Sequence, residues 1–344
     1  MVASSQVSNH FPFLKSRLCR AWLGGSQQLP APHWCHTGGC SGPVAPAETL
    51  FTTRADRAVR LRLDPEDPGA LPPITVHQLF QAAVERHGDR PALAYKRGQT
   101  WERRRRRRRA GPAAKGFLKL GLERFHGVAI LGSNSPEWVI ADFGAIMGGP
   151  WVQQQLPHLK AIVQYRDPLE EKRPNVYTWE EFMELGRTVP DSQLDSIIRS
   201  QCVNHCCLLI YTSGTTGTPK GVMLSHDNVT WQVRMLKEVL GLQGHEVVLS
   251  YLPLSHVAAQ CGDIWVAMSV AGTIFFAQPD ALKGSLVPTL KEVRPTILFA
   301  VPRVWEKMEE KLKAAFSQSS LVKRKLVEWA RGIGLQASYS RLDG

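Results

Sequence analysis

The sequence contains no uninterrupted apolar segment of the ~18 residues that a membrane-spanning helix requires. The nearest candidate, residues 264–278, is shorter and is interrupted by Ser269, Gly272 and Thr273. Cysteine is also scarce, with seven in 344 residues, which excludes a dense disulfide framework and favours a reducing compartment. We therefore expect a cytoplasmic protein, and peripheral contact with the endoplasmic reticulum or another membrane stays open.

Acidic residues are absent from positions 1–47, where serine, glycine, proline and histidine are frequent. An acid-free leader that contains Lys15, Arg17 and Arg20 loosely matches an organelle transit peptide. The absence of apolar periodicity favours a leader without targeting value. We expect residues 1–74 to be disordered or loop-rich, with the folded domain after them.

The net charge of +12 suggests a polyanion partner, but most of it comes from one segment. Arg103–Arg109 is an unbroken run of seven arginines, and the rest of the chain carries only +5. Because adjacent like charges repel one another, we interpret the run as a solvated, poorly ordered segment. It lacks the interleaved aromatic residues that single-strand binding favours. No specific nucleic acid is therefore expected as a partner.

The first periodic part of the chain predicts the opening of a doubly wound α/β domain. Apolar residues recur at helical spacing over residues 75–88, and residues 91–95 are strand-like. Residues 127–131 predict a buried strand, and a turn joins them to a helix over residues 136–147. Strand, turn and helix open a doubly wound unit. The parallel strand that should follow is weak, and only residues 161–164 are strand-like.

The second half of the chain alternates predicted strands with helices, one of them after His226. Apolar stripes over residues 304–316 and 322–330 predict two more helices that pack through those faces. Alternation of this kind predicts a doubly wound α/β fold with mainly parallel sheets and flanking helices. The strands are expected at residues 206–212, 221–224, 247–252, 273–276 and 296–300.

The sharpest motif is Tyr211–Gly221, with the sequence YTSGTTGTPKG. Its glycines let the backbone approach a ligand closely and turn N–H groups inward. Serine and threonine hydroxyls and the ammonium of Lys220 add donors that suit phosphate oxygens. The motif is not a Walker P-loop, because Gly214 and Gly217 are three apart and Pro219 precedes the lysine. A flexible surface loop is the alternative, which the preceding apolar strand and the stiff proline disfavour.

This loop and the following Val222–His226 resemble the phosphate-binding signature of adenylate-forming, AMP-binding enzymes. Two later segments, Tyr251–His256 and Val301–Lys307, are similar to long-chain acyl-CoA synthetases. The likeness covers roughly residues 75–335, with gaps. It resembles the bubblegum-type branch most in residues 115–138, 156–186 and 214–231.

The resemblance implies a two-step reaction on a long-chain fatty acid, ATP and coenzyme A. The carboxylate attacks the α-phosphate of ATP to give acyl-AMP and pyrophosphate, and the coenzyme A thiol then displaces AMP. Donors in the loop would offset the charge on pyrophosphate, with help from Mg²⁺. Lys220 and His256 are implied to act in catalysis, and Thr216 to hold Mg²⁺. The residues implied to bind ATP are Thr212, Ser213, Gly214, Thr215, Thr216, Gly217, Thr218, Pro219 and Lys220.

Two of these implications have structural alternatives. His256 is implied to lie beside the acyl-adenylate pocket, but histidine also serves commonly as a helix cap or a core residue. For Arg303, a role in shaping the site and a structural salt bridge stay equally open.

The sequence departs from the family in three places. The Tyr-Gly-x-Ser/Thr-Glu segment that contacts adenine and holds Mg²⁺ is absent, as are the hinge aspartate and the C-terminal lid domain with its catalytic lysine. About thirty residues, one βαβ unit, are expected to be deleted around residues 149–153. We therefore expect residues 75–344 to be a partial, incomplete AMP-binding domain with impaired fatty acid–CoA ligase turnover. The alternative is a catalytically inactive nucleotide-binding or interaction protein of that family.

Overall fold

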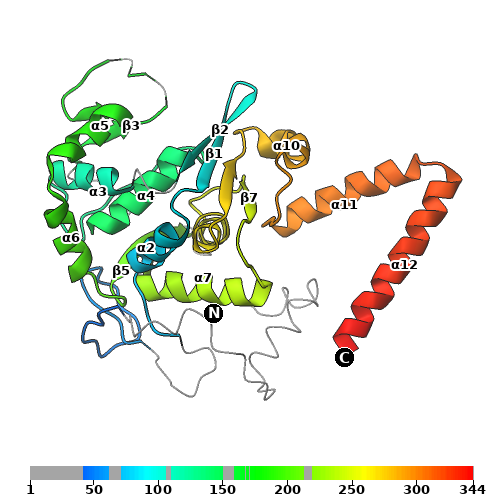
Figure 1. The fold of residues 1–344 in the computed structure, drawn as a ribbon, viewed down its shortest axis with the longest axis horizontal. Helices are drawn as coiled ribbons and strands as arrows, with labels where there is room; N and C mark the ends of the chain where they lie inside the picture. The colour runs from blue at the N-terminus through cyan, green and yellow to red at the C-terminus, as the bar shows by residue number, and fades with distance from the viewer. Residues whose placement is uncertain are drawn as a thin grey trace. The chain divides into compact units, whose positions relative to one another are not determined.

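The computed structural model describes residues 42–61, 71–105, 110–149, 159–166, 168–169, 171–212 and 219–343. The chain divides into two compact units. The first is Thr37–Leu298, and the second combines Met1–His36 with Phe299–Gly344. The described residues of the first unit form sheets and helices, and those of the second form helices (Figure 1).

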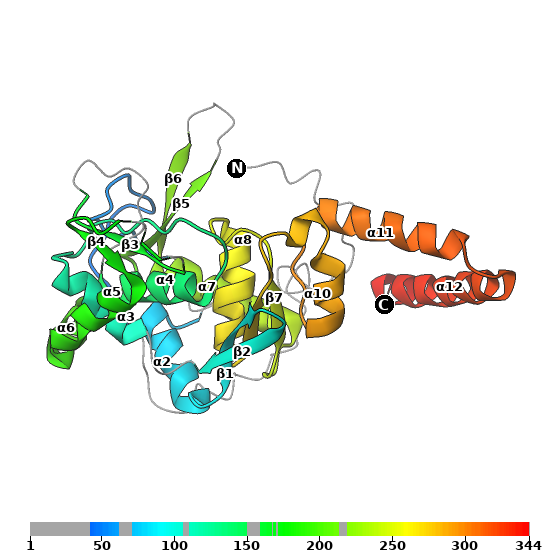
Figure 2. The same cartoon turned by 90° about the horizontal axis from the view of Figure 1, so that it is seen from above.

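The largest sheet of the first unit has the strand order β2-β1-β8-β7, and Figure 2 labels β2, β1 and β7. Its strands are β1 (Pro91–Arg97), β2 (Thr100–Arg105), β7 (Val247–Ser250) and β8 (Thr273–Phe276). Strands β1 and β7 both pair in parallel with β8, whereas β2 returns antiparallel beside β1. In β8, Ile274, Phe275 and Phe276 are all buried, as expected for a strand that is covered on both faces.

Helices α2, α4 and the continuous helical segment α8–η3–α9 pack through aromatic rings. Phe143 of α4 lies between Phe80 of α2 and Trp265 of η3, with ring centroids 4.9 and 4.8 Å away. The side chains of Thr75 and Ser135 cap α2 and α4 by accepting backbone N–H groups of the first turn. Both helices predicted in the first periodic part are confirmed. The helices around this sheet and its neighbouring segments are α2 (Val76–His87), α4 (Pro136–Gly148), α7 (His226–Leu240), α8 (Val257–Ala259), η3 (Gln260–Val266), α9 (Ala267–Ser269), η4 (Ala281–Lys283) and α10 (Leu286–Val293).

A second cluster of helices surrounds a small parallel strand pair, β3–β4. Phe117 of α3 and Phe182 of α5 lie 4.8 Å apart between ring centroids. Gly116 permits this approach, because a Cβ there would lie 2.7 Å from the Phe182 ring. The predicted strand at residues 161–164 is confirmed as β3. The elements are α3 (Ala110–Lys119), β3 (Ile162–Gln164), β4 (Val176–Thr178), α5 (Trp179–Leu185), η2 (Gly186–Thr188) and α6 (Asp191–Ser200).

Two strand predictions need correction. Residues 128–131 belong to no strand among the described residues, because an apolar run becomes a strand only beside a hydrogen-bonded neighbour. Residues 296–300 contribute only an isolated parallel bridge between Ile297 and Val248. The strands predicted at residues 206–212 and 221–224 are confirmed as β5 (Cys206–Thr212) and β6 (Lys220–Ser225), which form an antiparallel hairpin. Seven residues join them, whereas a parallel crossover needs roughly a dozen or more.

The arginine run is partly structural, so its interpretation as a poorly ordered segment is wrong for its first residues, although Arg103 is exposed to solvent. Arg103 and Arg104 lie in β2. The guanidinium of Arg103 lies 5.7 Å from the ring centroid of Phe275, and that of Arg104 lies 4.6 Å from the ring of Tyr95. Aromatic faces attract such cations and offset their mutual repulsion. Residues 106–109 lie outside the described part of the chain.

The described residues of the second unit form α11 (Pro302–Ser317) and α12 (Leu321–Asp343). These helices were predicted, but the burial predicted for their apolar stripes is not found. Helix α11 contains no buried residue, and Leu326 and Trp329 of α12 are 60% and 64% exposed. Across the described chain, no helix combines the length and apolar character needed to cross a membrane.

Candidate functional site

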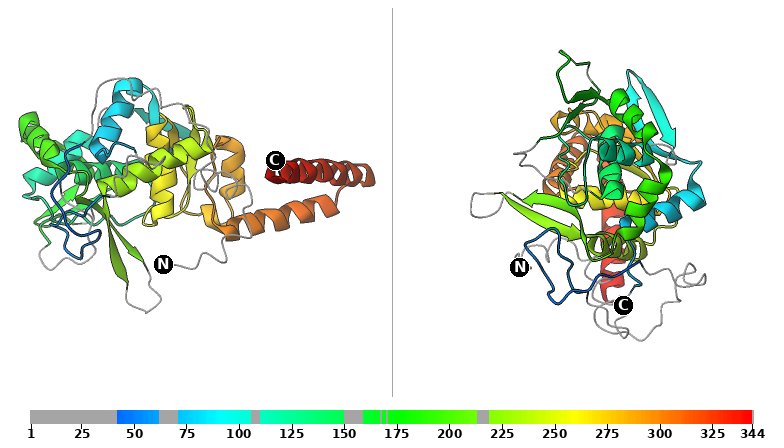
Figure 3. Two further views of the ribbon diagram at one scale, coloured as in Figure 1. Left: turned by 90° about the horizontal axis from the view of Figure 1, so that it is seen from below. Right: turned by 90° about the vertical axis from the view of Figure 1, so that its left-hand side faces the viewer.

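The β5–β6 hairpin presents the two ends of the glycine- and threonine-rich motif side by side (Figure 3, left). Thr212 at the end of β5 pairs with Lys220 at the start of β6, and both residues are exposed. Gly221 allows the strands to pack closely, since a Cβ there would lie 3.2 Å from Leu209. Predicted site residues Thr212, Pro219 and Lys220 therefore flank the connecting loop. The predicted residues Ser213, Gly214, Thr215, Thr216, Gly217 and Thr218 lie outside the described part of the chain.

The base of the hairpin is fixed by the first turn of α7. Ser225 and Asn228 form a reciprocal capping box, in which each side chain accepts the other's backbone N–H at 3.1 Å. Beside them, Nδ1 of His226 accepts the backbone N–H of Val76 at 3.2 Å. Burial, with His205 close by, lowers the pKa of His226 to about 3. This neutral imidazole anchors the end of the hairpin to α2.

His256 caps the short helix α8. Its Nδ1 accepts the backbone N–H of Ala258 at 3.1 Å, and the residue is exposed. Of the two alternatives for His256, the structure therefore shows the helix cap. Because the cap uses Nδ1, Nε2 is the ring nitrogen left to face a ligand, and a catalytic role stays a prediction.

Asn134 braces the segment that leads to His256. Its Nδ2 donates to Ser250 Oγ at 2.9 Å and to the Leu252 carbonyl at 2.7 Å, while its Oδ1 accepts the Leu254 N–H at 3.2 Å. One amide therefore ties the end of β7 to the two residues around Pro253. Sequence reasoning treated Asn134 only as part of a turn. An amide side chain in a turn after an apolar run was the available signal.

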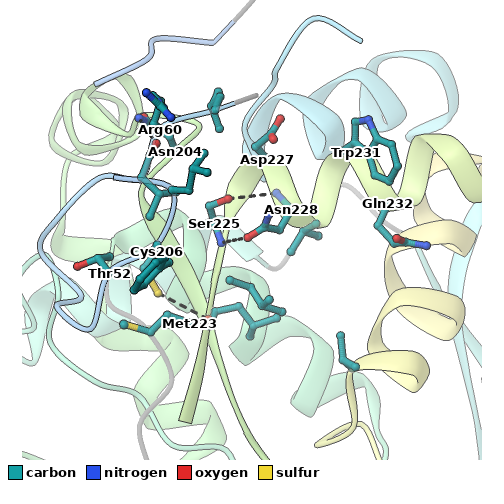
Figure 4. A pocket seen from close by; sticks show the side chains of 18 of the residues that line it. Thr52, Arg60, Asn204, Cys206, Met223, Ser225, Asp227, Asn228, Trp231 and Gln232 are labelled. Carbon is teal, nitrogen blue, oxygen red and sulfur yellow. Dashed lines mark hydrogen bonds between the residues drawn. The ribbon is translucent and has the colours of Figure 1, made fainter. Parts of the chain in front are cut away.

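A pocket of about 940 Å³ borders both motif-bearing regions. The lining includes Met223 from the hairpin, Trp231 from α7, and Val257 and Cys261 from α8 and η3. Residues of the loop 42–61 also line it, and Figure 4 shows the pocket from close by. Lys220 and His256 do not line it. Strand β6, which begins at Lys220, and helix α8, which His256 caps, nevertheless both contribute residues to the pocket. Sequence reasoning did not predict this pocket.

A protein-family model described as AMP-binding enzyme matches residues 80–161 and 152–332, well over half of the chain. The chain belongs to the AMP-binding enzyme family. The two matched segments of this family member meet at residues 152–161, close to the deletion predicted around residues 149–153. That deletion stays a prediction.

Curated relatives of this AMP-binding family member are long-chain fatty acid–CoA ligases. The chain is 52% identical over 342 residues to the long-chain-fatty-acid–CoA ligase ACSBG2 of Xenopus laevis, covering 86% of this chain and 46% of that protein. It is 46% identical over 337 residues to ACSBG1 of Homo sapiens, covering 85% and 46%. The chain thus spans about half the length of the curated relatives it matches. The predicted relationship to the bubblegum-type ligases is confirmed.

Two solved structures support the fold. The adenylation domain of a carboxylate reductase from Mycobacterium chelonae matches with a TM-score of 0.55 at 18% identity, over 73% of this chain and 50% of that one. The N-terminal domain of FACL13 from Mycobacterium tuberculosis matches with a TM-score of 0.53 at 19% identity, over 68% and 64%. The α/β fold class is confirmed.

The remaining predicted site residue of this AMP-binding enzyme, Arg303, lies in the second unit. It pairs with Glu306 at 3.4 Å on the surface of α11. Of the two alternatives left open for Arg303, the structure therefore shows the salt bridge. Surface pairs of this kind contribute little to stability.

Proposed function

We propose that this AMP-binding family member binds ATP at Thr212–Lys220 and activates a long-chain fatty acid by adenylation, for transfer to coenzyme A. The observation that carries the proposal is the pairing of Thr212 with Lys220 across the β5–β6 hairpin. This pairing holds a hydroxyl and an ammonium at the two ends of a loop rich in glycine and threonine. Such a loop can bind a nucleoside triphosphate, because backbone N–H groups and a fixed cation both stabilise phosphate oxygens.

The chemistry proposed for these residues is electrostatic. Lys220 and the hydroxyls of the loop would stabilise the negative charge that grows on the leaving pyrophosphate. Mg²⁺ would supply further charge neutralisation when bound, and the Thr216 hydroxyl is the residue proposed to hold it. His256 would present Nε2 toward the acyl-adenylate. Palmitate and coenzyme A enter as substrates, on the strength of the long-chain ligase relatives.

The proposed setting is the cytoplasm, with peripheral contact to a membrane that supplies fatty acid. A second candidate function is nucleotide binding without turnover. The pairing of Thr212 with Lys220 supports nucleotide binding and by itself requires no turnover.

Two measurements on the full chain test the proposal. ATP binding is followed by calorimetry, and adenylation by palmitate-dependent exchange of pyrophosphate into ATP. Lys220→Met should weaken ATP binding at least about tenfold, because it removes a charge-assisted hydrogen bond. The matched control is Lys291→Met, which changes an exposed lysine of α10 and should leave ATP binding unchanged.

The outcomes separate the two candidates. Palmitate-dependent exchange supports the ligase, whereas ATP binding without exchange supports the inactive nucleotide binder. A folded sample with no measurable affinity for ATP, or equal affinity in wild type and Lys220→Met, overturns the proposed site.

A further inference from the structure

Strand β2 is an edge of the four-stranded sheet, since β1 is its only neighbour among the described strands. Figure 2 shows the two strands side by side. At six residues, Thr100–Arg105 has the full length of an ordinary strand. No other described residue forms a backbone hydrogen bond with β2 on the side that faces away from β1. An edge of this kind can accept a further strand.

The register of the β1–β2 hairpin decides which backbone groups of β2 face outward. Arg97 pairs with Thr100 across a two-residue turn. A turn of that length is closed by a hydrogen-bonded pair, and such pairs alternate with non-hydrogen-bonded pairs along an antiparallel ladder. The pairs that Trp101 and Arg103 form with β1 are therefore of the second kind. The N–H and C=O groups of these two residues consequently point away from β1, toward the outer side of the sheet.

Natural sheets protect such edges with proline, a bulge, a covering element or charge. Strand β2 contains no proline, and the register shift of the hairpin places its extra residue, Ala92, in β1. No other described strand pairs with this edge. Charge is the protection that β2 does have, because Arg103–Arg105 are all arginines. Protection by one sign of charge is selective, since it repels a second copy of β2 and attracts an acidic strand.

Arg103 is the described arginine of β2 that can meet such a strand. It is exposed and forms no ion pair with another described residue, whereas Arg104 pairs with Glu137 at 2.9 Å. The guanidinium of Arg103 lies 5.7 Å from the ring centroid of Phe275, and the ring of Trp101 lies 5.0 Å from the same ring. These contacts fix β2 on the sheet, so the outward backbone groups are held in place before a partner arrives.

We propose that β2 binds an acidic, extended segment of a partner protein as a fifth strand of the sheet. The outward backbone groups of Trp101 and Arg103 pair with the incoming strand, and a carboxylate of that strand lies beside Arg103. Main-chain hydrogen bonds supply affinity in this mode of recognition, and the side chains of alternate residues supply specificity. The site is separate from the proposed nucleotide site at Thr212–Lys220 and does not rest on the proposed function.

The test uses the full chain and fluorescent peptides of about eight residues, which match the length of the edge. One peptide alternates glutamate with valine, a second alternates lysine with valine, and a third repeats the first with every backbone nitrogen methylated. Fluorescence anisotropy should show binding of the first alone, because it combines negative charge with N–H groups that can pair. Its binding should slow hydrogen exchange of the Trp101 and Arg103 amides at least about tenfold.

Two substitutions at Arg103 separate charge from backbone pairing. Arg103→Gln keeps the outward N–H and should weaken the acidic peptide about two- to fivefold, because it removes one cross-strand charge pair. Arg103→Pro also removes the outward N–H and should weaken the peptide at least about tenfold. Proline is tolerated where the N–H faces away from the sheet, so the hairpin should persist. Arg199→Gln changes an exposed arginine of α6 and is the matched control, which should leave binding unchanged.

Several outcomes would overturn the proposal. Equal binding of the acidic and methylated peptides means that charge alone attracts them, and equal binding of the lysine peptide excludes charge selection. Capture of homopolymeric RNA or of phosphatidylserine vesicles without the acidic peptide makes the arginines a general polyanion site. Dimerisation that protects the Trp101 and Arg103 amides means that a second copy takes the edge. If Arg103→Pro does not fold, Arg103→Gln and the methylated peptide still decide the result.

Discussion

Two regions of the molecule contain helices of similar apolar periodicity but differ completely in burial. In the first unit, Phe182 is 0% and Trp265 is 1% exposed, and each contacts other aromatic rings. In the second unit, the comparable aromatic residues Trp305 and Trp329 are 41% and 64% exposed. Apolar periodicity therefore specifies a helix in both regions, whereas a core forms only where a partner face lies opposite.

Charged groups show the same contrast. The carboxyls of Asp142 and Asp263 are buried in the first unit, and both oxygens of Asp142 and Oδ2 of Asp263 have no hydrogen-bond partner among the described residues. On α11, Glu309 instead pairs with Lys313 at 2.7 Å on the surface. Buried, unsatisfied carboxyls cost stability, whereas exposed pairs change it little. Substitutions of aromatic residues and of carboxyls can therefore compare the change in the free energy of unfolding between the two regions.

The largest expected difference is between two tryptophans. Trp265→Ala removes a buried indole from contact with Phe143 and should lower the free energy of unfolding by about 3–5 kcal/mol. Trp329→Ala on α12 should change it by less than about 0.5 kcal/mol. Urea unfolding of both variants measures the two values. A comparable loss in Trp329→Ala would show that the second unit is packed after all.

The buried carboxyls give the second prediction, which concerns pH. Burial raises the pKa of Asp142 from 3.8 to about 7. Between these values the folded chain keeps a proton that the unfolded chain has released. The free energy of unfolding therefore falls as pH rises, by about 1.4 kcal/mol per pH unit for this carboxyl, and the loss is complete above the folded pKa.

Asp142→Asn should remove the part of the slope that Asp142 contributes and leave a similar part from Asp263, since burial also raises the pKa of Asp263 to about 7. The control is Asp280→Asn, which changes an exposed carboxyl and should leave the slope unchanged. Urea midpoints measured between pH 4 and pH 7 provide the comparison. An unchanged slope in Asp142→Asn would contradict the prediction that burial raises the pKa of Asp142 in the folded chain.

Local signals in the sequence predicted the elements better than their pairing. The helix after Thr75 and strand β8 lie where apolar spacing and turn residues placed them. Residues 128–131 and 296–300 carry the same apolar signal without becoming named strands, because a strand depends on a neighbour that is distant in sequence. Arg103 and Arg104 were misread for the same reason, since the rings that they contact belong to other strands.

The candidate site divides in the same way. The motif around Lys220 was recognisable because eleven consecutive residues carry it. Asn134 and Asn204 were not recognised, although each makes at least three hydrogen bonds that shape the site region. Their partners lie more than a hundred positions away for both residues, and no local pattern predicts such contacts. The pocket depends on the same distant contacts.

The smallest effects are expected at glycines, and they have opposite signs in the two regions. Gly116→Ala would place a Cβ 2.7 Å from the Phe182 ring and 2.9 Å from the Phe182 carbonyl oxygen. The backbone oxygen cannot rotate away, so overpacking should destabilise the first unit by about 1–3 kcal/mol.

Gly334→Ala on α12 meets no described atom within 4 Å. It should raise helix stability by about 0.5–1 kcal/mol, because alanine loses less backbone entropy than glycine. Urea unfolding measures the first substitution and amide hydrogen exchange of α12 the second. Faster exchange in Gly334→Ala would mean that a close neighbour covers this face of the helix, and the contrast between the two regions would then fail at this position.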